Sequence, residues 1–212
     1  MRKFIITGTD TEIGKTTFSA ALLQAMNKAG HATSYWKPVQ SGLDGMVDTR
    51  TVQKLSGLGD EIFLEEAYVL SEPLSPHKSA EIDGVEIDLD RLNLPETEGG
   101  LLVEGAGGLM VPLTRKALFV NQFKRWDLPV ILCARAGLGT INHTLLSLEA
   151  LWSRKIPVHG LVFIGEGNPD NIATIAQLSG EKVLGWLPQL EEVNAQSLSV
   201  AFQKNFDIHD FV

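Results

Sequence analysis

The chain has 212 residues, of which 44% are hydrophobic and 21% are charged, and its formal net charge is -8 at pH 7. These values are ordinary for a globular protein, and the length allows a full core, so we expect residues 1–212 to form a single domain. The negative charge argues against general affinity for nucleic acid or anionic membranes, so we expect neither as a partner.

The only cysteine, Cys133, cannot form an internal disulfide, which fits a reducing compartment. It lies in an apolar run, so we expect a core residue rather than a nucleophile. No apolar run approaches the length of a membrane span, and the first strand begins too early to leave room for a signal peptide. We therefore expect a cytoplasmic protein.

The first predicted elements are a buried strand at Phe4–Gly8 and a helix at Lys15–Ala29, joined by a glycine-bounded loop that ends in Gly14-Lys15-Thr16. Backbone N–H groups and a helix N-terminus form an anion site in this arrangement. Lys15 can reach the terminal phosphates of a nucleotide, and the Thr16 hydroxyl can bind Mg²⁺. The segment therefore predicts a phosphate-binding loop.

This loop is one residue wider than usual, because five residues separate Gly8 from Gly14 where four are common. Its interior is polar and contains Asp10 and Glu12. A loop that held only phosphate would gain little from acidic residues beside that anion. We infer that part of the loop faces a second substrate that carries amines; the alternative is a solvated loop without nucleotide.

Strand-like and helix-like segments alternate along the rest of the chain. This alternation predicts an α/β fold with a mostly parallel central sheet and helices on both faces. Together with the phosphate loop, it indicates a fold of the phosphate-loop NTPase type. The further predicted strands are Thr33–Pro38, Leu101–Glu104, Val130–Ala134, Val158–Ile164 and Val183–Leu187. The further predicted helices are Leu118–Trp126, Asn142–Ser153, Asn171–Ser179 and Asn194–Lys204. Because ligands bind beyond the carboxyl ends of such strands, the residues after each strand become the site candidates.

Lys37 ends the second predicted strand and should point at the same crevice as the phosphate loop. Pro38 cannot continue a central ladder, so the chain is expected to turn there. A cation at Lys37 can neutralise charge that develops on a transferring phosphoryl group, and Ser41 can donate to a substrate oxygen. The alternative for Lys37 is a surface lysine at a strand end.

The region from Leu43 to Gly99 fits the alternation least well. It is rich in Asp, Glu, Ser, Pro and Gly, and we expect it to wrap the edge of the sheet or the site. Asp48 stands before a helix-like stretch in this region. It is either the N-cap of that helix or a second carboxylate ligand for Mg²⁺.

Glu104 follows the apolar run at Leu101–Val103 and precedes the small residues Gly105 to Gly108. A carboxylate across from the loop threonine is a natural Mg²⁺ ligand, and small residues let the backbone approach phosphate closely. The alternative is a plain turn.

Further on, the loop Arg135–His143 leads into a helix N-terminus whose free N–H groups could hold a carboxylate. His143 in that first turn is expected to be structural rather than a general base.

Five segments together resemble the dethiobiotin synthetase family, the ATP-dependent enzymes of biotin biosynthesis, which are members of the deviant phosphate-loop group. They span most of the chain in the family's order and spacing, and the wide loop with the Lys-Pro-Val-x-Ser-Gly element is quite specific. The segments are Gly8–Thr16, Lys37–Gly42, Ser75-Pro76-His77, Glu104–Gly108 with Pro112-Leu113, and Leu138–His143.

The resemblance implies a ligase that forms carbon–nitrogen bonds. 7,8-Diaminopelargonate would take up CO₂ as a carbamate on one amine, ATP would phosphorylate the carbamate, and the second amine would close the ureido ring. The products would be dethiobiotin, ADP and phosphate. The resemblance also implies Mg²⁺ as cofactor, bound by Thr16, Asp48 and Glu104, and a homodimer with its sites at the subunit boundary.

Individual roles follow from the same resemblance. Lys37, Lys15 and Thr11 would be catalytic, with Lys37 stabilising charge on the carbamate and the transferring phosphate. Substrate contacts would come from Thr11, Lys37, Ser41 and the helix start at Gly139, Thr140, Ile141 and Asn142, which would bind the substrate carboxylate of the neighbouring subunit's site. Nucleotide contacts would come from Glu12, Ile13, Gly14, Lys15, Thr16, Thr17, Asp48, Glu104, Gly105, Ala106, Gly107, Ile164, Gly165, Pro188, Gln189 and Leu190.

One departure from the family concerns the nucleobase. Well-known members carry an Asn-Asp pair after the fifth strand, and that Asn reads adenine. Alignment by the strand places Ile164 at the Asn position, and this side chain cannot hydrogen-bond a base. Either base selectivity is weak or Asn168 substitutes, while Pro188–Leu190 aligns with the family's other base-contacting loop.

The main alternative is a partitioning or regulatory ATPase of the same deviant phosphate-loop group. Those proteins need a second lysine five positions before the loop lysine, where this chain has Asp10, and the sequence shows neither a basic surface nor an amphipathic terminal helix. A ligase domain of the cobyrinate amidation type would normally come with a glutaminase domain, for which 212 residues leave no room. A non-catalytic nucleotide-binding module would tolerate the loss of Lys37.

Overall fold

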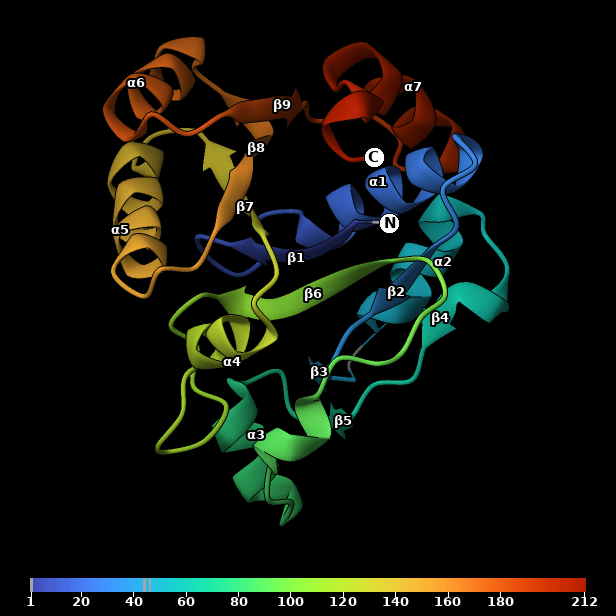
Figure 1. Cartoon of the computed structure of the whole chain (residues 1–212), viewed down its shortest axis with the longest axis vertical. Coiled ribbons are helices and arrows are strands. Elements are labelled where there is room, and N and C mark those ends of the chain that lie inside the picture. The colour runs from blue at the N-terminus through green and yellow to red at the C-terminus, as the bar shows by residue number, and fades with distance from the viewer. Residues whose placement is uncertain (1, 44, 46) are drawn as a thin grey trace.

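A computed structural model describes residues 2–43, 45 and 47–212. Its centre is a seven-stranded sheet in the order β4-β2-β6-β1-β7-β8-β9, in which every neighbouring pair is parallel (Figure 1). The strands are β1 (Lys3–Gly8), β2 (Thr33–Trp36), β4 (Phe63–Leu64), β6 (Gly100–Gly108), β7 (Val130–Ala136), β8 (Val158–Gly167) and β9 (Val183–Leu187). The predicted parallel α/β architecture is confirmed.

Helices cover both faces of this sheet because its strands are apolar on both sides. Along β1, Phe4 and Ile6 pack into one hydrophobic cluster, whereas Ile5 packs into the other. The first cluster holds residues of α1 (Lys15–Lys28), α2 (Asp48–Ser56) and α7 (Ala195–Asn205). The second holds residues of α4 (Phe119–Trp126), α5 (Thr140–Trp152) and α6 (Pro169–Ser179), which lie across the sheet from α1 (Figure 1). Within the described residues, none of the helices is both long and apolar enough to cross a bilayer.

The chain leaves the main sheet at Pro38, as predicted. β2 ends at Trp36, and β3 (Val39–Ser41) pairs in parallel with β5 (Tyr68–Leu70) in a separate two-stranded sheet. The helix α3 (Pro76–Asp83) packs beside it, and short 3₁₀ turns lie at Asp60–Ile62, Leu89–Leu92 and Ile208–Asp210. Apart from positions 44 and 46, the region from 43 to 99 thus forms the outer edge of the sheet at β4 and a small subsheet beside it.

Several strands extend beyond the predicted ends, and this changes where Glu104 lies. β6 continues to Gly108, so Glu104 lies inside the strand rather than at its end. The glycines carry the strand onward because they allow close approach: a Cβ at Gly108 would lie 3.3 Å from the Thr9 carbonyl oxygen. In the parallel pairing of β1 with β6, the last residue pair is Gly8 with Gly108, directly beside the phosphate loop.

Two helices begin two residues earlier than predicted. α5 starts at Thr140 rather than Asn142, and α6 starts at Pro169 rather than Asn171. Proline is favoured at the first helical position, and the Asn168 side chain caps α6 by accepting from the Asp170 N–H at 2.9 Å. Apolar periodicity cannot detect these first turns, because they begin with a polar residue or proline.

Cys133 is a core residue, as expected from its apolar run. It lies in β7, pairs with Gly8 on one side and Val162 on the other, and is fully buried. Burial raises the pKa of its thiol, so the side chain stays protonated and unreactive.

Candidate active site

The phosphate loop joins β1 to the first turn of α1, between the centre of the sheet and the helix. Gly14 sits at φ 93°, and a Cβ there would lie 2.8 Å from Ile164 Cγ2, so only glycine fits. Lys15 folds back over the loop, and its Nζ donates to the Asp10 carbonyl oxygen at 2.9 Å. Burial, together with the nearby Lys37, lowers the pKa of Lys15. The loop therefore has the conformation and the cation that a bound phosphate requires.

Lys37 is buried at the end of β2 and contacts both predicted carboxylates. Its Nζ lies 2.6 Å from Asp48 Oδ2 and 3.2 Å from Glu104 Oε1, and it donates to the Gly105 carbonyl oxygen at 3.1 Å. Burial alone would lower the pKa of Lys37, but Glu104 and Asp48 outweigh this and raise it. Lys37 is only 3% exposed, so the surface-lysine alternative is wrong.

Glu104 is completely buried and accepts hydrogen bonds on both oxygens. Its Oε1 accepts from Thr16 Oγ1 at 2.9 Å, and its Oε2 accepts from Ser19 Oγ at 2.6 Å and from the Tyr35 hydroxyl at 3.1 Å. Burial and the Glu104 charge raise the pKa of Tyr35 well above its usual value, so Tyr35 remains a donor. The plain-turn alternative for Glu104 is therefore wrong.

Sequence reasoning missed Ser19 and Tyr35, although spacing points to both. Ser19 lies one helical turn after Thr16, and Tyr35 lies two residues before Lys37 on the same face of β2. Periods of three to four in a helix and of two in a strand place these side chains beside the residues that were predicted.

Asp48 is the first residue of α2, and its side chain turns away from that helix. Val47 occupies the N-cap position without a side-chain cap bond, so the N-cap alternative for Asp48 is wrong. Asp48 Oδ1 lies 3.1 Å from Thr16 Oγ1, and the Asp48 N–H donates to Gln40 Oε1 at 3.2 Å. Burial would raise the pKa of Asp48, but the charge and hydrogen bond of Lys37 outweigh it and lower the pKa.

The oxygens of Thr16, Asp48 and Glu104 form a set that suits a hard cation. Thr16 Oγ1 lies 3.1 Å from Asp48 Oδ1 and 2.9 Å from Glu104 Oε1. The hydroxyl has a single proton and can donate to only one of these two carboxylates at a time, so the other oxygen–oxygen contact has no hydrogen bond from it. Two carboxylates and a hydroxyl are ligands that Mg²⁺ accepts together with phosphate oxygens. In the described part of the chain, no three His, Cys, Asp or Glu side chains gather as a metal cluster.

A cavity of about 920 Å³ brings most of the predicted residues together. Its lining includes the predicted Thr11, Glu12, Ile13, Gly14, Lys15, Thr16, Thr17, Lys37, Ser41, Asp48, Glu104, Ala106 and Gly107. It also includes Asp10 of the phosphate loop and residues to which no individual role was assigned from the sequence, namely Gln40, Gly42, Pro73, Leu74, Ser75, Pro76, Gly108 and Val111. Gly105 does not line it, because its carbonyl is turned to Lys37. The Ser41 Oγ is buried here and has no hydrogen-bond partner among the described residues.

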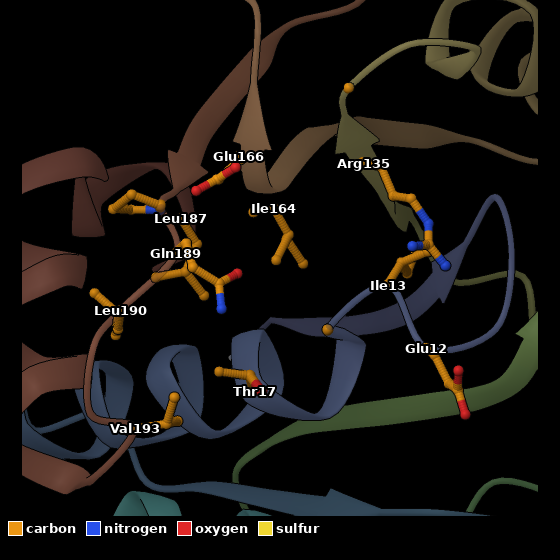
Figure 2. Close-up of a pocket in the computed structure, with 14 residues that line it drawn as sticks. Glu12, Ile13, Thr17, Arg135, Ile164, Glu166, Leu187, Gln189, Leu190 and Val193 are labelled. Atoms are coloured by element: carbon orange, nitrogen blue, oxygen red, sulfur yellow. The ribbon is translucent and has the colours of Figure 1, made fainter.

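A second cavity of about 360 Å³ adjoins the first at the phosphate loop and extends toward the ends of β8 and β9 (Figure 2). The predicted residues Ile164, Gly165, Pro188, Gln189 and Leu190 line it with Glu12, Ile13, Gly14 and Thr17. Ile164 and the Gln189 amide both point into it (Figure 2). Asn168 is not part of the lining, because its side chain caps α6, so the structure does not support it as a substitute base reader.

The predicted helix start lies apart from both cavities of this chain. Gly139 is the N-cap of α5, and Gly139–Asn142 line neither cavity. Thr140 donates its hydroxyl to the Arg135 carbonyl oxygen. Nearby, a shallow cavity of about 510 Å³ runs from Asp10 past Met110 to His143 and Leu146. His143 is exposed there, away from the phosphate cavity.

A central parallel strand, a glycine-bounded loop and a helix that begins with Lys15-Thr16 define a phosphate-loop nucleotide-binding protein. A family model described as an AAA domain matches residues 2–197. ATP-dependent dethiobiotin synthetase BioD of Brucella anthropi is 55% identical to the chain, covering 99% of it and 97% of the relative. The enzyme of the same name from a Rhodopseudomonas palustris strain is 52% identical, covering 100% and 97%. The chain therefore belongs to the ATP-dependent dethiobiotin synthetase family, which confirms the predicted resemblance.

Solved structures share the fold at much lower identity. The MinC:MinD cell division complex of Aquifex aeolicus matches with a TM-score of 0.54 and 12% identity, covering 95% of this chain and 86% of that one. The McdA structure from Cyanthece matches with a TM-score of 0.57 and 12% identity, covering 95% and 90%. These likenesses show the fold alone. The comparisons favour the synthetase over the partitioning alternative because these synthetases match at 52–55% identity over nearly the full chain, whereas the two solved structures match at 12% identity.

Proposed function

We propose that this chain is a dethiobiotin synthetase, a ligase that converts 7,8-diaminopelargonate, CO₂ and ATP to dethiobiotin, ADP and phosphate. The observation that carries the proposal is the position of Lys37. It reaches Glu104 and Asp48 beside the phosphate loop and lines the same cavity as Ser41 and Thr11. One cation therefore borders both the phosphate end of a nucleotide and the space for a second substrate.

The reaction has three steps with balanced atoms. One amine nitrogen of the substrate attacks CO₂ and loses a proton, giving a carbamate. A carbamate oxygen then attacks the γ-phosphorus of ATP, and ADP leaves. The second amine attacks the carbonyl carbon of the mixed anhydride, phosphate leaves, the nitrogen loses a proton, and the ureido ring is closed.

Lys37 is suited to stabilise the charge in the first two steps. Because Glu104 and Asp48 raise its pKa, the ammonium is charged at neutral pH, and because it is buried its field is weakly screened. A fixed cation aimed at developing negative charge is an efficient catalytic device. Lys15, which lines the same cavity, would hold the terminal phosphates.

We propose that Mg²⁺ binds to Thr16, Asp48 and Glu104. When bound with the nucleotide, Mg²⁺ would neutralise phosphate charge. Ser19 and Tyr35 hold the buried Glu104 carboxylate in place, and Gln40 holds the backbone of Asp48. The site residues are therefore fixed by their neighbours before any ligand arrives.

The diamine would occupy the part of the large cavity near Thr11 and Ser41. Ser41 Oγ is a buried polar atom with no partner among the described residues, so a substrate oxygen or amine can bond to it without displacing an existing hydrogen bond. Glu12 in the same lining provides a negative charge for an ammonium group. The nucleobase would enter the smaller cavity beside Ile164 and Gln189.

We also propose a homodimer, a single domain over residues 1–212 and a cytoplasmic location. Support for the dimer comes from the shallow cavity beside Asp10, where Met110 is 50% and Leu146 is 60% exposed. Exposed apolar side chains that gather around a cavity suit a protein interface. In a dimer through this face, the α5 start could serve the neighbouring site. Leu146→Glu should convert the dimer to a monomer in sedimentation experiments; a wild-type monomer would contradict this assignment.

One assay tests the proposed activity. The protein is incubated with 7,8-diaminopelargonate, bicarbonate, Mg²⁺ and ATP, and dethiobiotin is sought by mass spectrometry. Phosphate release should require the diamine and should match the dethiobiotin formed. Diamine-independent phosphate release without dethiobiotin would instead support an ATPase of the regulatory kind.

A further inference from the structure

Arg135 connects the end of β7 to the phosphate loop. It is the next-to-last residue of β7, and its side chain is exposed at the rim of the smaller cavity. Its Nη2 donates to the Thr11 carbonyl oxygen at 3.1 Å. The guanidinium reaches from β7 across to the loop near Ile13 (Figure 2). A strand of the sheet is thereby attached to the part of the loop that is one residue wider than usual.

The backbone that Arg135 holds is strained. Glu12 has φ 51°, a left-handed conformation that is uncommon for residues other than glycine. The Thr11 carbonyl belongs to the peptide directly before Glu12, so the bond from Arg135 fixes the orientation of that peptide. Such conformations persist only where the surrounding structure enforces them. Arg135 is therefore a specific support for the shape of the loop.

The charges around the smaller cavity give Arg135 a second role. Among its lining residues, all of which the structure describes, Glu12 and Glu166 are acidic and Arg135 is the one cation. Two carboxylates repel the phosphates of an entering nucleotide, and the neighbouring Lys15 lines the other cavity. A guanidinium has five N–H donors, and one bond to Thr11 leaves others for a ligand.

The backbone of Arg135 is itself fixed on both sides. Its carbonyl oxygen accepts from the Thr140 hydroxyl at the start of α5. In the pairing with β8, Arg135 lies opposite Ile164 but Ala136 lies opposite Gly167, so β8 bulges by two residues just beyond Arg135. Bulges at such positions redirect side chains, and this one places Gly165 and Glu166 on the cavity wall.

We propose that Arg135 is a nucleotide-binding and loop-positioning residue of this chain. It holds the widened phosphate loop through the Thr11 carbonyl and supplies the positive charge that offsets Glu12 and Glu166 where nucleotide phosphates pass. The proposal depends on the proposed function only in taking ATP as the nucleotide, and it holds for ADP equally.

Calorimetry with Mg²⁺–ADP tests it on the full chain. Arg135→Ala should weaken binding about 10-fold, the loss expected when a charged hydrogen bond is removed. Arg135→Lys keeps the charge and should bind within about 3-fold of wild type. Arg135→Gln keeps a donor but no charge and should bind more weakly than the lysine variant. Equal affinity of the alanine variant and wild type would overturn the proposal.

Arg125→Ala is a matched control. Arg125 also donates to a backbone carbonyl, that of Leu89 at 3.2 Å, yet lines neither cavity. Its loss should leave nucleotide affinity unchanged; an equal loss in both alanine variants would show a general effect on the fold and overturn the proposal. The affinity gap between wild type and Arg135→Ala should also shrink at high salt, because screening weakens an exposed charge. A merely structural role would leave the gap unchanged.

Steady-state kinetics separate this proposal from the proposed function. With dethiobiotin formation as the readout, Arg135→Ala should raise KM for ATP about 10-fold and leave KM for the diamine unchanged. If wild type forms dethiobiotin but Arg135→Ala binds ADP normally, only the role of Arg135 fails. If wild type forms no dethiobiotin but Arg135→Ala weakens ADP binding, only the synthetase assignment fails.

Discussion

The two cavities beside the phosphate loop differ in how their polar groups are held. In the larger one, Lys37 and Glu104 are buried and bonded to each other and to Asp48 and Thr16. In the smaller one, the side chains that point into the cavity include the apolar Ile164 and the exposed Gln189 (Figure 2). The site is thus rigid where phosphate chemistry would occur and apolar where a base would bind.

This difference indicates that catalysis depends on the larger cavity and nucleotide selectivity on the smaller one. Buried, pre-oriented charges stabilise a transition state strongly because they need little rearrangement. Apolar contacts, in contrast, distinguish poorly between molecules of similar shape, whereas buried hydrogen-bonding groups reject a wrong partner. Changes on the Lys37 side should therefore have large effects, and changes on the Ile164 side should mainly alter nucleotide preference.

The largest expected effect follows from removing Lys37. Lys37→Ala should lower dethiobiotin formation about 10³-fold, as expected when a cation or donor that stabilises developing charge is lost. Nucleotide affinity should stay near the wild-type value, because Lys15 and the loop remain. Product formation by mass spectrometry and calorimetry with Mg²⁺–ADP measure the two quantities. Unchanged product formation would remove Lys37 from its assigned role.

The thermal stability of the Lys37→Ala variant tests the metal assignment separately from activity. Without Lys37, the Asp48 and Glu104 carboxylates lose the cation that bridges them, so the metal-free protein should melt at a lower temperature. Mg²⁺ with ADP should restore much of this loss if the carboxylates bind the metal. A melting temperature of the variant that does not change when Mg²⁺ and ADP are added would argue against the metal assignment.

The next effect concerns Glu104. Glu104→Gln keeps the shape of the side chain but removes its charge. Mg²⁺–ADP affinity should fall by at least about 10–100-fold, the loss typical even of residues that only support a metal ligand. Tyr35→Phe is the comparison variant, because it removes only the hydroxyl that bonds to Glu104 Oε2 and should have a smaller effect. Equal calorimetric affinity of Glu104→Gln and wild type would count against Glu104 as a ligand.

A smaller effect should appear at the nucleobase. Because the Ile164 side chain in the smaller cavity cannot hydrogen-bond a base, GTP or CTP should support at least about a tenth of the ATP rate, which is about 1.4 kcal/mol of discrimination. Ile164→Asn should increase the preference for ATP. A far steeper preference for ATP in wild type would mean that other groups, with Gln189 as the nearest candidate, read the base.

The smallest effect is a pH dependence of stability on the Lys37 side. The folded state lowers the pKa of Asp48, so its contribution is present above the unfolded pKa and is lost as pH falls through the folded value. Urea unfolding of the metal-free protein from pH 7 to pH 3 should show this loss, and the loss should be smaller in the Lys37→Ala variant, because the lysine no longer lowers the pKa of Asp48. Ile164→Asn should leave the acid profile unchanged. Identical acid profiles for Lys37→Ala and wild type would contradict the pairing.

Much of the fold could be predicted because strands that are buried on both faces are continuously apolar. The phosphate loop and Lys37 could be placed by the rule that ligands gather at the carboxyl ends of parallel strands. The same rule identified Glu104, although β6 continues past it to Gly108. Ser19 and Tyr35, which hold Glu104, were missed because each looks like an ordinary helix or strand residue, although their spacing from Thr16 and Lys37 places them beside the site. The short helices and strands between residues 43 and 99 could not be predicted for a related reason. They are set by contacts with distant segments rather than by local periodicity.

Arg135 shows a further limit of prediction from sequence. It stands at the end of an apolar run, and its contact with Thr11 depends on the adjacency of β7 and β1, which are far apart in the chain. The bulge that places Glu166 on the cavity wall is a register shift between β7 and β8, and register leaves no trace in a single strand's composition.

Trp186 gives the smaller cavity a spectroscopic signature. Its indole N–H donates at 2.7 Å to the carbonyl oxygen of Gly165, which lines that cavity, while Trp36 and Trp126 pack together elsewhere in the core. Indole fluorescence responds to changes in hydrogen bonding and polarity. A base that settles against Gly165 should therefore shift the emission of Trp186, and nucleotide titrations can be followed on the unlabelled protein.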